Sequence, residues 1–241
     1  MPTGSGKSHV IAGLCKDALE RWPETKIIIL THSKELIEQD AEKVKLHWPE
    51  APLGIYSASV GAKEIDSITV AGIQSIYNKA EKIGYRDLVI VDEAHTINHK
   101  DEGMYRNFLR ALMEINPSIR IVGLTATPYR LGHGLITDKP AIFDDLLYPV
   151  DIPELIAKGR LAPLKSKNTQ EKIDVTQVKK RGGDYVEKEL HEAINKNIPQ
   201  TERIINDIIE IAKDRKSWLF FCAGVQHAET VNSYLNINGI E

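Results

Sequence analysis

The sequence has only two cysteines and lacks any long hydrophobic run. Cys15 and Cys222 lie far apart among 241 residues, so they form no metal-ligand pair, and a reduced cytosolic setting is the simplest interpretation. The apolar runs, such as 218–222, are much shorter than the roughly 20 residues needed to span a bilayer. The first residues do not resemble a signal peptide either. We therefore expect a soluble, cytoplasmic protein with no membrane partner.

The sequence also lacks a large excess of charge of either sign. A net charge of -3 and a pI near 6.3 exclude a general polycation, although a local basic groove remains open because net charge does not describe patches. The chain is 42% hydrophobic and 27% charged, which is ordinary for a globular protein and excludes intrinsic disorder and a collagen-like chain. A chain of this length can bury a sizeable core.

Short apolar runs alternate with helical patterns along the first half of the chain. The runs predict strands at residues 26–30, 67–71, 87–91 and 119–124. A helix with Ser33 as its N-cap follows the first strand, and another helix ends at Asn116–Pro117. This alternation is typical of βαβ units, so we expect an α/β fold with a parallel sheet. Ligands of such sheets bind at the carboxyl ends of the strands.

The second half of the chain follows a different pattern. We expect a first domain at residues 1–148, a connector or elaboration at 149–200, and an incomplete second domain at 201–241. The connector is rich in lysine, which indicates either a solvated surface or contact with nucleic-acid phosphates. The last segment predicts a helix, a strand at 218–222 and a second helix, which cannot bury both faces of a sheet.

Three short segments carry the chemistry, and the first lies at the start of the chain. It consists of Thr3, Gly4, Ser5, Gly6, Lys7 and Ser8, and it resembles the end of the phosphate-binding pattern G-x-x-x-x-G-K-[ST]. Glycines let backbone N–H groups converge on phosphate oxygens, and the helix that follows adds positive potential. Lys7 would contact the β- and γ-phosphates and Ser8 would ligate Mg²⁺.

This loop is not decisive by itself. Met1 stands where the pattern has its first glycine, and no strand precedes the loop. The triplet of Gly, Lys and Ser or Thr arises by chance in roughly one chain in eight of this length, from average composition. A glycine-rich turn that caps a helix is the alternative.

The second segment is Asp92-Glu93-Ala94-His95, directly after an apolar strand. A buried strand that ends in two carboxylates is costly unless the charges meet a cation or face a cleft. Mg²⁺-nucleotide supplies such a cation, with Asp92 on the metal and Glu93 as the base that activates water. The alternatives are a solvated strand end and a structural histidine.

The third segment, Thr125-Ala126-Thr127, follows the next strand and precedes Pro128. Two short hydroxyl side chains at a strand end can relay hydrogen bonds between nucleotide carboxylates and a neighbouring domain. A threonine-rich turn before proline is the alternative.

In this order and spacing, the three segments resemble motifs I, II and III of the superfamily 2 helicases of the DEAD/DEAH-box type. Residues 30–36 resemble motif Ia, residues 73–76 the segment near motif Ib, and residues 220–228 motif IV. Residues 127–132 and 155–161 further resemble bacterial RadD-type and related phage helicases. The resemblance implies a RecA-like P-loop NTPase sheet with helices on both faces, plus the start of a second RecA-like domain.

The resemblance also implies a role for each matching residue. Catalysis would involve Lys7, Asp92, Glu93 and His95, with ATP bound by residues 3–8 and Mg²⁺ by Ser8 and Asp92. Coupling would involve Thr125, Ala126 and Thr127. Nucleic acid would contact Thr31, His32, Ser33 and Gln74.

We therefore expect an ATP-dependent helicase or translocase that acts on nucleic acid, DNA rather than RNA. A motor subunit of a restriction system and a nucleotide-binding interaction module without turnover are the alternatives. Motifs V and VI have no counterpart in these 241 residues. Because an arginine finger is worth about 10³ to 10⁵ in rate, we expect this chain alone to be a very poor ATPase and no helicase.

Overall fold

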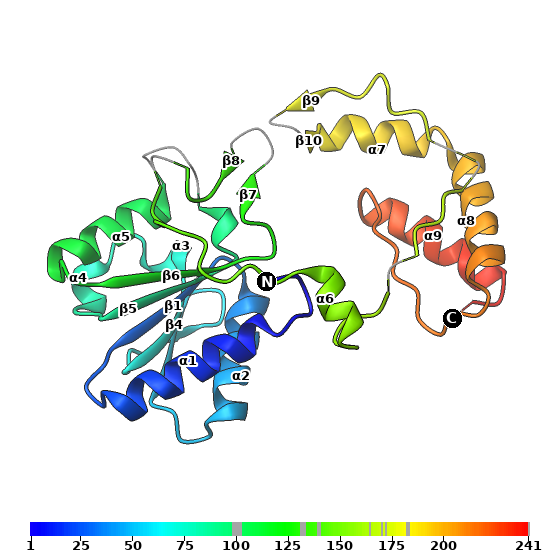
Figure 1. Cartoon of the computed structure of the whole chain (residues 1–241). Helices are drawn as coiled ribbons and strands as arrows, with labels where there is room; N and C mark the ends of the chain where they lie inside the picture. The colour runs from blue at the N-terminus through cyan, green and yellow to red at the C-terminus, as the bar shows by residue number, and fades with distance from the viewer. Residues whose placement is uncertain are drawn as a thin grey trace. The chain divides into compact units, whose positions relative to one another are not determined.

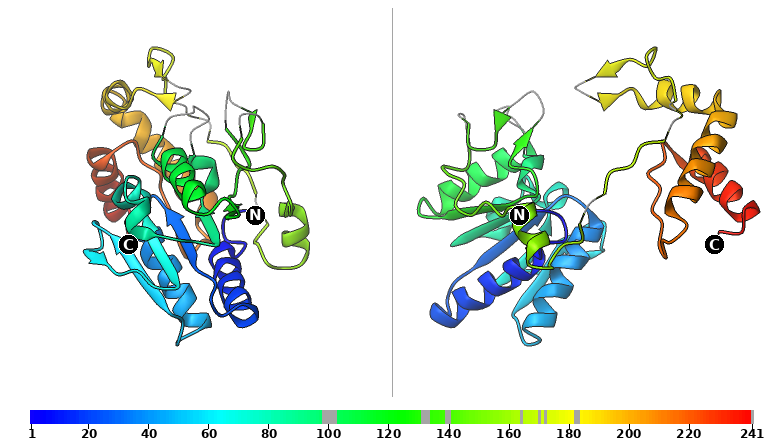
Figure 2. Two further views of the ribbon diagram at one scale, coloured as in Figure 1. Left: turned by 90° about the vertical axis from the view of Figure 1, so that its left-hand side faces the viewer. Right: turned by 45° about the vertical axis from the view of Figure 1, so that its right-hand side comes forward.

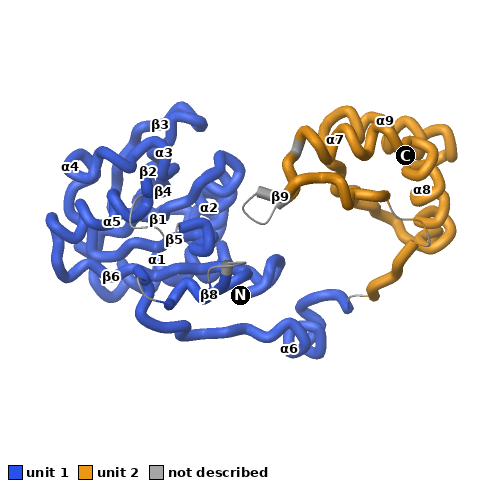
Figure 3. The backbone as a smooth tube through the Cα atoms, turned by 90° about the horizontal axis from the view of Figure 1, so that it is seen from above, with its two compact units in different colours: residues 1–163 blue, residues 164–241 orange. Residues whose placement is uncertain are grey.

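The computed structural model describes residues 1–97, 103–130, 134–138, 141–163, 165–169, 171, 173–181 and 184–240. The chain divides into two compact units, Met1–Pro163 and Leu164–Glu241 (Figure 3). Residues 131 and 132, which end one of the RadD-like segments, lie outside the described ranges.

Unit 1 is built around a six-stranded sheet with the order β3-β2-β4-β1-β5-β6. The strands are β1 (Ile27–Thr31), β2 (Leu53–Ser57), β3 (Ala62–Lys63), β4 (Ile68–Gly72), β5 (Leu88–Asp92) and β6 (Arg120–Leu124). All neighbours pair in parallel except β3, which runs antiparallel to β2. A small hairpin, β7 (Tyr129–Arg130) with β8 (Gly134–Leu135), follows.

Helices cover both faces of this sheet (Figure 1; Figure 2). The helices of unit 1 are α1 (Lys7–Arg21), α2 (Lys34–His47), α3 (Ile73–Ile76), α4 (Ala80–Ile83), α5 (Met104–Ile115) and α6 (Ile152–Ala157), with a 3₁₀ turn η1 (Ala94–Thr96). Side chains alternate along β1, so Ile27 and Ile29 join the core beneath α1 and α2, whereas Ile28 and Leu30 join the core beneath α3, α4 and α5. Both cores are therefore apolar, and the expected α/β arrangement is confirmed.

The local signals predicted most of these elements. The four predicted strands match β1, β4, β5 and β6 to within a residue at each end. Ser33 caps α2 by accepting the N–H of Leu36 at 3.3 Å, and α5 ends at Asn116 before Pro117. Strands β2 and β3 were not predicted. Gly54 interrupts the apolar run of β2, and a side chain there would come within 2.7 Å of the Glu64 carbonyl oxygen.

Unit 2 consists mainly of three helices that pack on one another. They are α7 (Glu187–Asn195), α8 (Ile198–Ala212) and α9 (Val225–Ile237), preceded by a hairpin of β9 (Lys180–Arg181) and β10 (Asp184–Tyr185). The predicted helices of the second domain correspond to α8 and α9.

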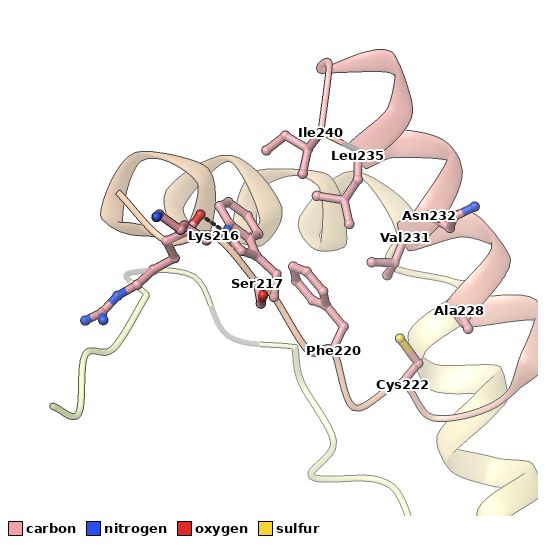
Figure 4. A pocket seen from close by; sticks show the side chains of 11 residues that line it. Lys216, Ser217, Phe220, Cys222, Ala228, Val231, Asn232, Leu235 and Ile240 are labelled. Atoms are coloured by element: carbon pink, nitrogen blue, oxygen red, sulfur yellow. Dashed lines mark hydrogen bonds between the residues drawn. The ribbon is translucent and has the colours of Figure 1, made fainter. Parts of the chain in front are cut away.

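The predicted strand at residues 218–222 is wrong. This segment has no regular secondary structure, and the strand pairing in the described part of unit 2 is that of β9 with β10. Phe220 and Cys222 instead lie on the same side as Val231 and Leu235 of α9, where they line a pocket of about 580 Å³ (Figure 4). A strand requires a hydrogen-bonded neighbour, and an apolar run alone does not supply one.

Among the described residues, no helix combines the length and the apolar character that crossing a membrane requires.

Close packing around Gly123 in β6 predicts that alanine at this position and alanine at Gly13 change the stability of the protein in opposite directions. A methyl group on Gly123 would lie 2.6 Å from the Phe143 ring and 2.8 Å from the Ala94 side chain, whereas one on Gly13 of α1 would meet nothing within 4 Å. We expect Gly123→Ala to lower the free energy of unfolding by about 1–3 kcal/mol. Gly13→Ala should raise it by about 0.5–1 kcal/mol, because alanine favours the exposed helix.

Urea unfolding followed by circular dichroism measures both changes. Equal effects of the two substitutions would contradict the packing described around Gly123.

Candidate nucleotide-binding site

The candidate site lies at the carboxyl ends of the parallel strands. Strand β5 ends in Asp92, β6 is followed directly by Thr125, and β1 ends in Thr31. Because β1, β5 and β6 are parallel neighbours, these ends meet at one edge of the sheet. Helix α1 packs against the face of this sheet, and its first residues approach the same edge.

The phosphate loop turns sharply at two glycines. Gly4 and Gly6 have φ angles of 77° and 92°, in the left-handed region where a side chain is strained. Gly6 is the N-cap of α1 and offers no side chain to its first turn. The amide groups there are therefore not taken up by a capping side chain, which is the arrangement that binds anions at helix N-termini. Thr3 is exposed, and Ser5 donates its hydroxyl to the Pro2 carbonyl at 2.6 Å.

The acidic pair, Asp92 and Glu93, consists of two carboxylates in different environments. Asp92 is buried, and its pKa is raised, first by burial and then by the neighbouring charge of Glu93. Glu93 has φ 49° and ψ 53°, the one positive φ of a non-glycine residue among the described residues. This left-handed conformation directly follows the last residue of β5 and precedes the 3₁₀ turn η1.

Lys7 and Glu93 join the loop to the acidic pair. The Lys7 Nζ lies 3.1 Å from Glu93 Oε1, and the two side chains are 10% and 20% exposed. The Coulomb attraction in an ion pair this well shielded from water is stronger than the attraction in a surface pair. The structure therefore brings together two predicted residues that are 86 positions apart in the chain (93 minus 7).

His95 extends this contact to the third segment. Its Nδ1 lies 3.3 Å from Glu93 Oε2 and 2.8 Å from Thr125 Oγ1. The Thr125 hydroxyl oxygen also accepts the Thr127 N–H at 3.1 Å and lies 3.1 Å from the Thr127 carbonyl oxygen. His95 Nδ1 and the Thr125 hydroxyl are satisfied when Nδ1 carries the proton and donates to Thr125, whose hydroxyl donates to the Thr127 carbonyl. Glu93 Oε2 then has no hydrogen-bond partner among the described residues. Ala126 is half-buried between the two threonines.

The oxygen groups near Lys7 fit a hard divalent cation. Ser8 is buried, and the Asp92 Oδ1 has no hydrogen-bond partner within the described part of the chain. No three His, Cys, Asp or Glu side chains of that part converge to hold a metal by themselves. Mg²⁺ commonly takes one or two protein oxygens and completes its shell with phosphate and water oxygens. Ser8 and Asp92 therefore fit Mg²⁺ that arrives with a nucleotide.

The residues predicted to contact nucleic acid differ in their accessibility. Gln74 donates its side-chain amide to the His32 carbonyl at 2.9 Å, and both residues line a pocket of about 300 Å³ beside the start of α5. Ser33 uses its hydroxyl to cap α2. Thr31 is fully buried in the sheet, so its side chain does not reach the surface in this structure.

Two residues of α2 belong to the site although the sequence analysis did not single them out. Gln39 donates its side-chain amide to Ser8 Oγ at 3.0 Å. Asp40 is 1% exposed, and burial, then Asp92, raises its pKa to about 7, while the Ser8 hydroxyl opposes the rise. A signal was present, because Asp40 stands three residues after Ile37 and four before Val44, within the buried stripe of α2.

A family profile matches residues 1–130, more than half of the chain. Its description is the res subunit of type III restriction enzymes, ResIII. The chain belongs to the ResIII family. This family lies within the superfamily 2 helicases, whose members use ATP, so the resemblance seen in the three segments is confirmed at that level.

Individual relatives of this ResIII chain are distant. It is 26% identical to a 51.5 kDa protein of a Lactococcus phage over 91% of the chain and 42% of the relative. It is 27% identical to a protein of Schizosaccharomyces pombe named as a mitochondrial ATP-dependent helicase, irc3, over 100% of the chain and 39% of the relative. The chain thus spans about two-fifths of the length of these curated relatives.

A solved structure supports the fold of the ResIII chain. The crystal structure of UvsW from bacteriophage T4 superposes with a TM-score of 0.50 at 19% identity, over 98% of this chain and 46% of that one. The α/β RecA-like fold of helicases is therefore shared.

The buried carboxyl of Asp40 predicts a pH dependence of stability for this ResIII chain. Its pKa near 7 exceeds the unfolded value of about 3.9, so between pH 4 and 7 the folded state holds a proton that the unfolded state has lost. The stability contribution is present at low pH and is lost as the pH rises through 7. We expect the free energy of unfolding to fall more between pH 5 and 8 in the parent than in Asp40→Asn, by on the order of 2 kcal/mol.

Urea unfolding at each pH measures this difference. Parallel curves for the two proteins would show that Asp40 titrates normally.

Proposed function

We propose that the chain carries the ATP-binding domain of a nucleic-acid helicase or translocase, and that residues 3–8 and 92–95 hold one Mg²⁺-nucleotide. The contact between Lys7 and Glu93 carries this proposal, because it joins the phosphate loop to the acidic pair. Membership of a family of ATP-dependent motors supports it. The RadD-type resemblance of residues 127–132 and 155–161 is part of the same proposal.

In this proposal, the residues of the loop bind the phosphates of the nucleotide, and Glu93 accepts a proton from water. The amides at the start of α1 and the Lys7 ammonium group hold the phosphates. Ser8 and Asp92 would hold Mg²⁺, which when bound neutralises charge on the phosphate oxygens. Lys7 must leave Glu93 to reach a phosphate, and this frees the Glu93 carboxylate for water.

The chemistry then follows from the position of Glu93. The freed carboxylate accepts a proton from a water molecule whose oxygen attacks the γ-phosphorus, while the bond from that phosphorus to the β–γ bridging oxygen breaks. The products are ADP and phosphate. His95 Nδ1 lies close to both Glu93 and Thr125, so we propose that residues 125–127 sense whether Glu93 is engaged.

We further propose that the partner is nucleic acid, DNA rather than RNA. His32 and Gln74 lie at the sheet edge beside a pocket, where polar groups can contact a sugar-phosphate backbone. Ser33 and Thr31 would contribute through the main chain, since one hydroxyl caps a helix and the other is buried. ATP binding and hydrolysis would shift the population between two arrangements of RecA-like domains in the whole protein.

A second candidate is the motor subunit of a restriction system. The description of the matching family favours it, since that description names a restriction subunit. The two candidates share ATP-driven movement along nucleic acid and differ in whether a nuclease acts with the motor. A nucleotide-binding module without turnover remains the third candidate, and the ATPase measurement below separates it from both.

Substitution of Lys7 tests the nucleotide site directly. We expect Lys7→Ala to weaken ADP binding about tenfold to a hundredfold, because a charge-assisted contact with phosphate is lost and Glu93 is left unpaired. Lys16→Ala is the matched control, since Lys16 lies on the same helix and pairs with Glu20 at the surface. Calorimetry on the 241-residue chain measures both variants. Equal affinity in parent and Lys7→Ala would remove the phosphate-loop assignment.

Substitution of Glu93 tests catalysis separately from binding. We expect Glu93→Gln to retain nucleotide binding and to lose ATP turnover by about 10²-fold or more, because an amide does not accept the proton of water. Glu20→Gln is an exposed control. Turnover is measured in the longest form of the protein that hydrolyses ATP, with single-stranded DNA, forked DNA or RNA added. Undiminished turnover in Glu93→Gln would show that another group is the base.

A further inference from the structure

Asp40 occupies a position that a helix normally gives to an apolar residue. It belongs to the buried face of α2 together with Ile37, Ala41 and Val44. Helix α2 packs against α1 through this face, and the surrounding core is apolar. A carboxyl group in such a stripe loses its hydration, so a leucine or alanine would suit packing better.

The Asp40 carboxyl is also unpartnered. Neither Oδ1 nor Oδ2 makes a hydrogen bond within the described part of the chain, and the residue is 1% exposed. The groups that influence it electrostatically are Asp92, Ser8, Glu93 and Lys7, which are all residues of the candidate nucleotide site. The Asp40 carboxyl therefore lies close enough to that site to be influenced by its charges, although it belongs to a different helix from Lys7 and Ser8.

Ser8 is the residue of the site whose hydroxyl could become a hydrogen-bond partner of Asp40, because it already influences that carboxyl. A hydroxyl group has one hydrogen to donate and two lone pairs that accept. The amide of Gln39 donates to Ser8 Oγ at 3.0 Å and takes one lone pair. If the hydrogen points to Asp40, the second lone pair remains for a cation. Gln39 and Asp40, consecutive on α2, then fix the orientation of the hydroxyl between them.

We propose that Asp40 is a positioning residue of the nucleotide site, which takes up the Ser8 hydroxyl hydrogen and directs the remaining Ser8 lone pair to the divalent cation that accompanies the nucleotide. This inference rests on the proposed function. Asp40 acts through Ser8 and is not itself a ligand, in accord with the absence of a three-residue metal cluster among the described residues. Groups that orient a metal ligand commonly change metal affinity about tenfold to a hundredfold when they are replaced.

The test separates cation binding from nucleotide binding. ADP affinity is measured by calorimetry on the 241-residue chain in EDTA, and Mn²⁺ affinity of the ADP complex is measured by electron paramagnetic resonance. The variants are Asp40→Asn, which keeps the shape and an acceptor oxygen, and Asp40→Leu, which suits the apolar core. Glu38→Gln removes the same charge from the exposed side of α2, where Glu38 is 53% exposed and pairs with Lys34, and serves as the control.

We expect ADP affinity in EDTA to stay within about twofold of the parent in all variants. Mn²⁺ affinity should fall about tenfold to a hundredfold in Asp40→Leu, fall less in Asp40→Asn, and stay unchanged in Glu38→Gln. If Asp40 had a purely structural role, its variants would change the unfolding midpoint without lowering Mn²⁺ affinity selectively over ADP affinity.

Three results would overturn the inference. Unchanged Mn²⁺ affinity in Asp40→Leu, with ADP still bound through Lys7, would refute the role of Asp40 and leave the proposed function intact. A parallel loss of ADP affinity in EDTA would show that Asp40 supports the loop and not the cation. Failure of the parent to bind ADP in either condition would refute the proposed function itself, and this inference with it.

Discussion

The ion pair between Lys7 and Glu93 is the interaction on which the site depends. It joins the first turn of α1 to the end of β5, and without it the phosphate loop and the acidic pair would be two unconnected features of one sheet edge. The parallel pairing of β1, β5 and β6 makes the contact feasible, because it brings the carboxyl ends of these strands together. The fold places these strand ends at one edge of the sheet, and the charges of Lys7 and the acidic pair determine which ligands can bind there.

The ion pair involves a residue with an unusual backbone conformation. Glu93 is held in a left-handed conformation that a glutamate adopts only at a cost in free energy. Lys7 Nζ lies 3.1 Å from one oxygen of its carboxylate, and His95 Nδ1 lies 3.3 Å from the other. Asp92 remains behind in the core with an unpartnered oxygen. The two neighbouring carboxylates therefore differ in exposure, since Asp92 is buried and the Glu93 side chain is 20% exposed.

The sequence predicted those parts of the molecule that depend on local pattern. The isoleucine run of β1, the cap at Ser33 and the three motif segments indicated both the fold and the site. Properties that depend on neighbours were not predictable. Gly54 interrupts the apolar pattern of β2 because the backbone at Glu64 approaches it closely. Residues 218–222 were predicted as a strand, although no strand in the described part of the chain pairs with them. Asp40 is a polar residue within a helical pattern, and its burial depends on how α2 packs on α1 and on the sheet.

The central claim is that one metal-bound nucleotide contacts the loop and the acidic pair together. Paramagnetic broadening of backbone amide resonances by Mn²⁺, recorded with and without ADP, tests it most directly. We expect ADP-dependent loss of the resonances of residues 4–8 and 91–94 together, while those of the distant amino ends of β1 and β5 persist. Broadening of one segment without the other, or of neither, would contradict the account.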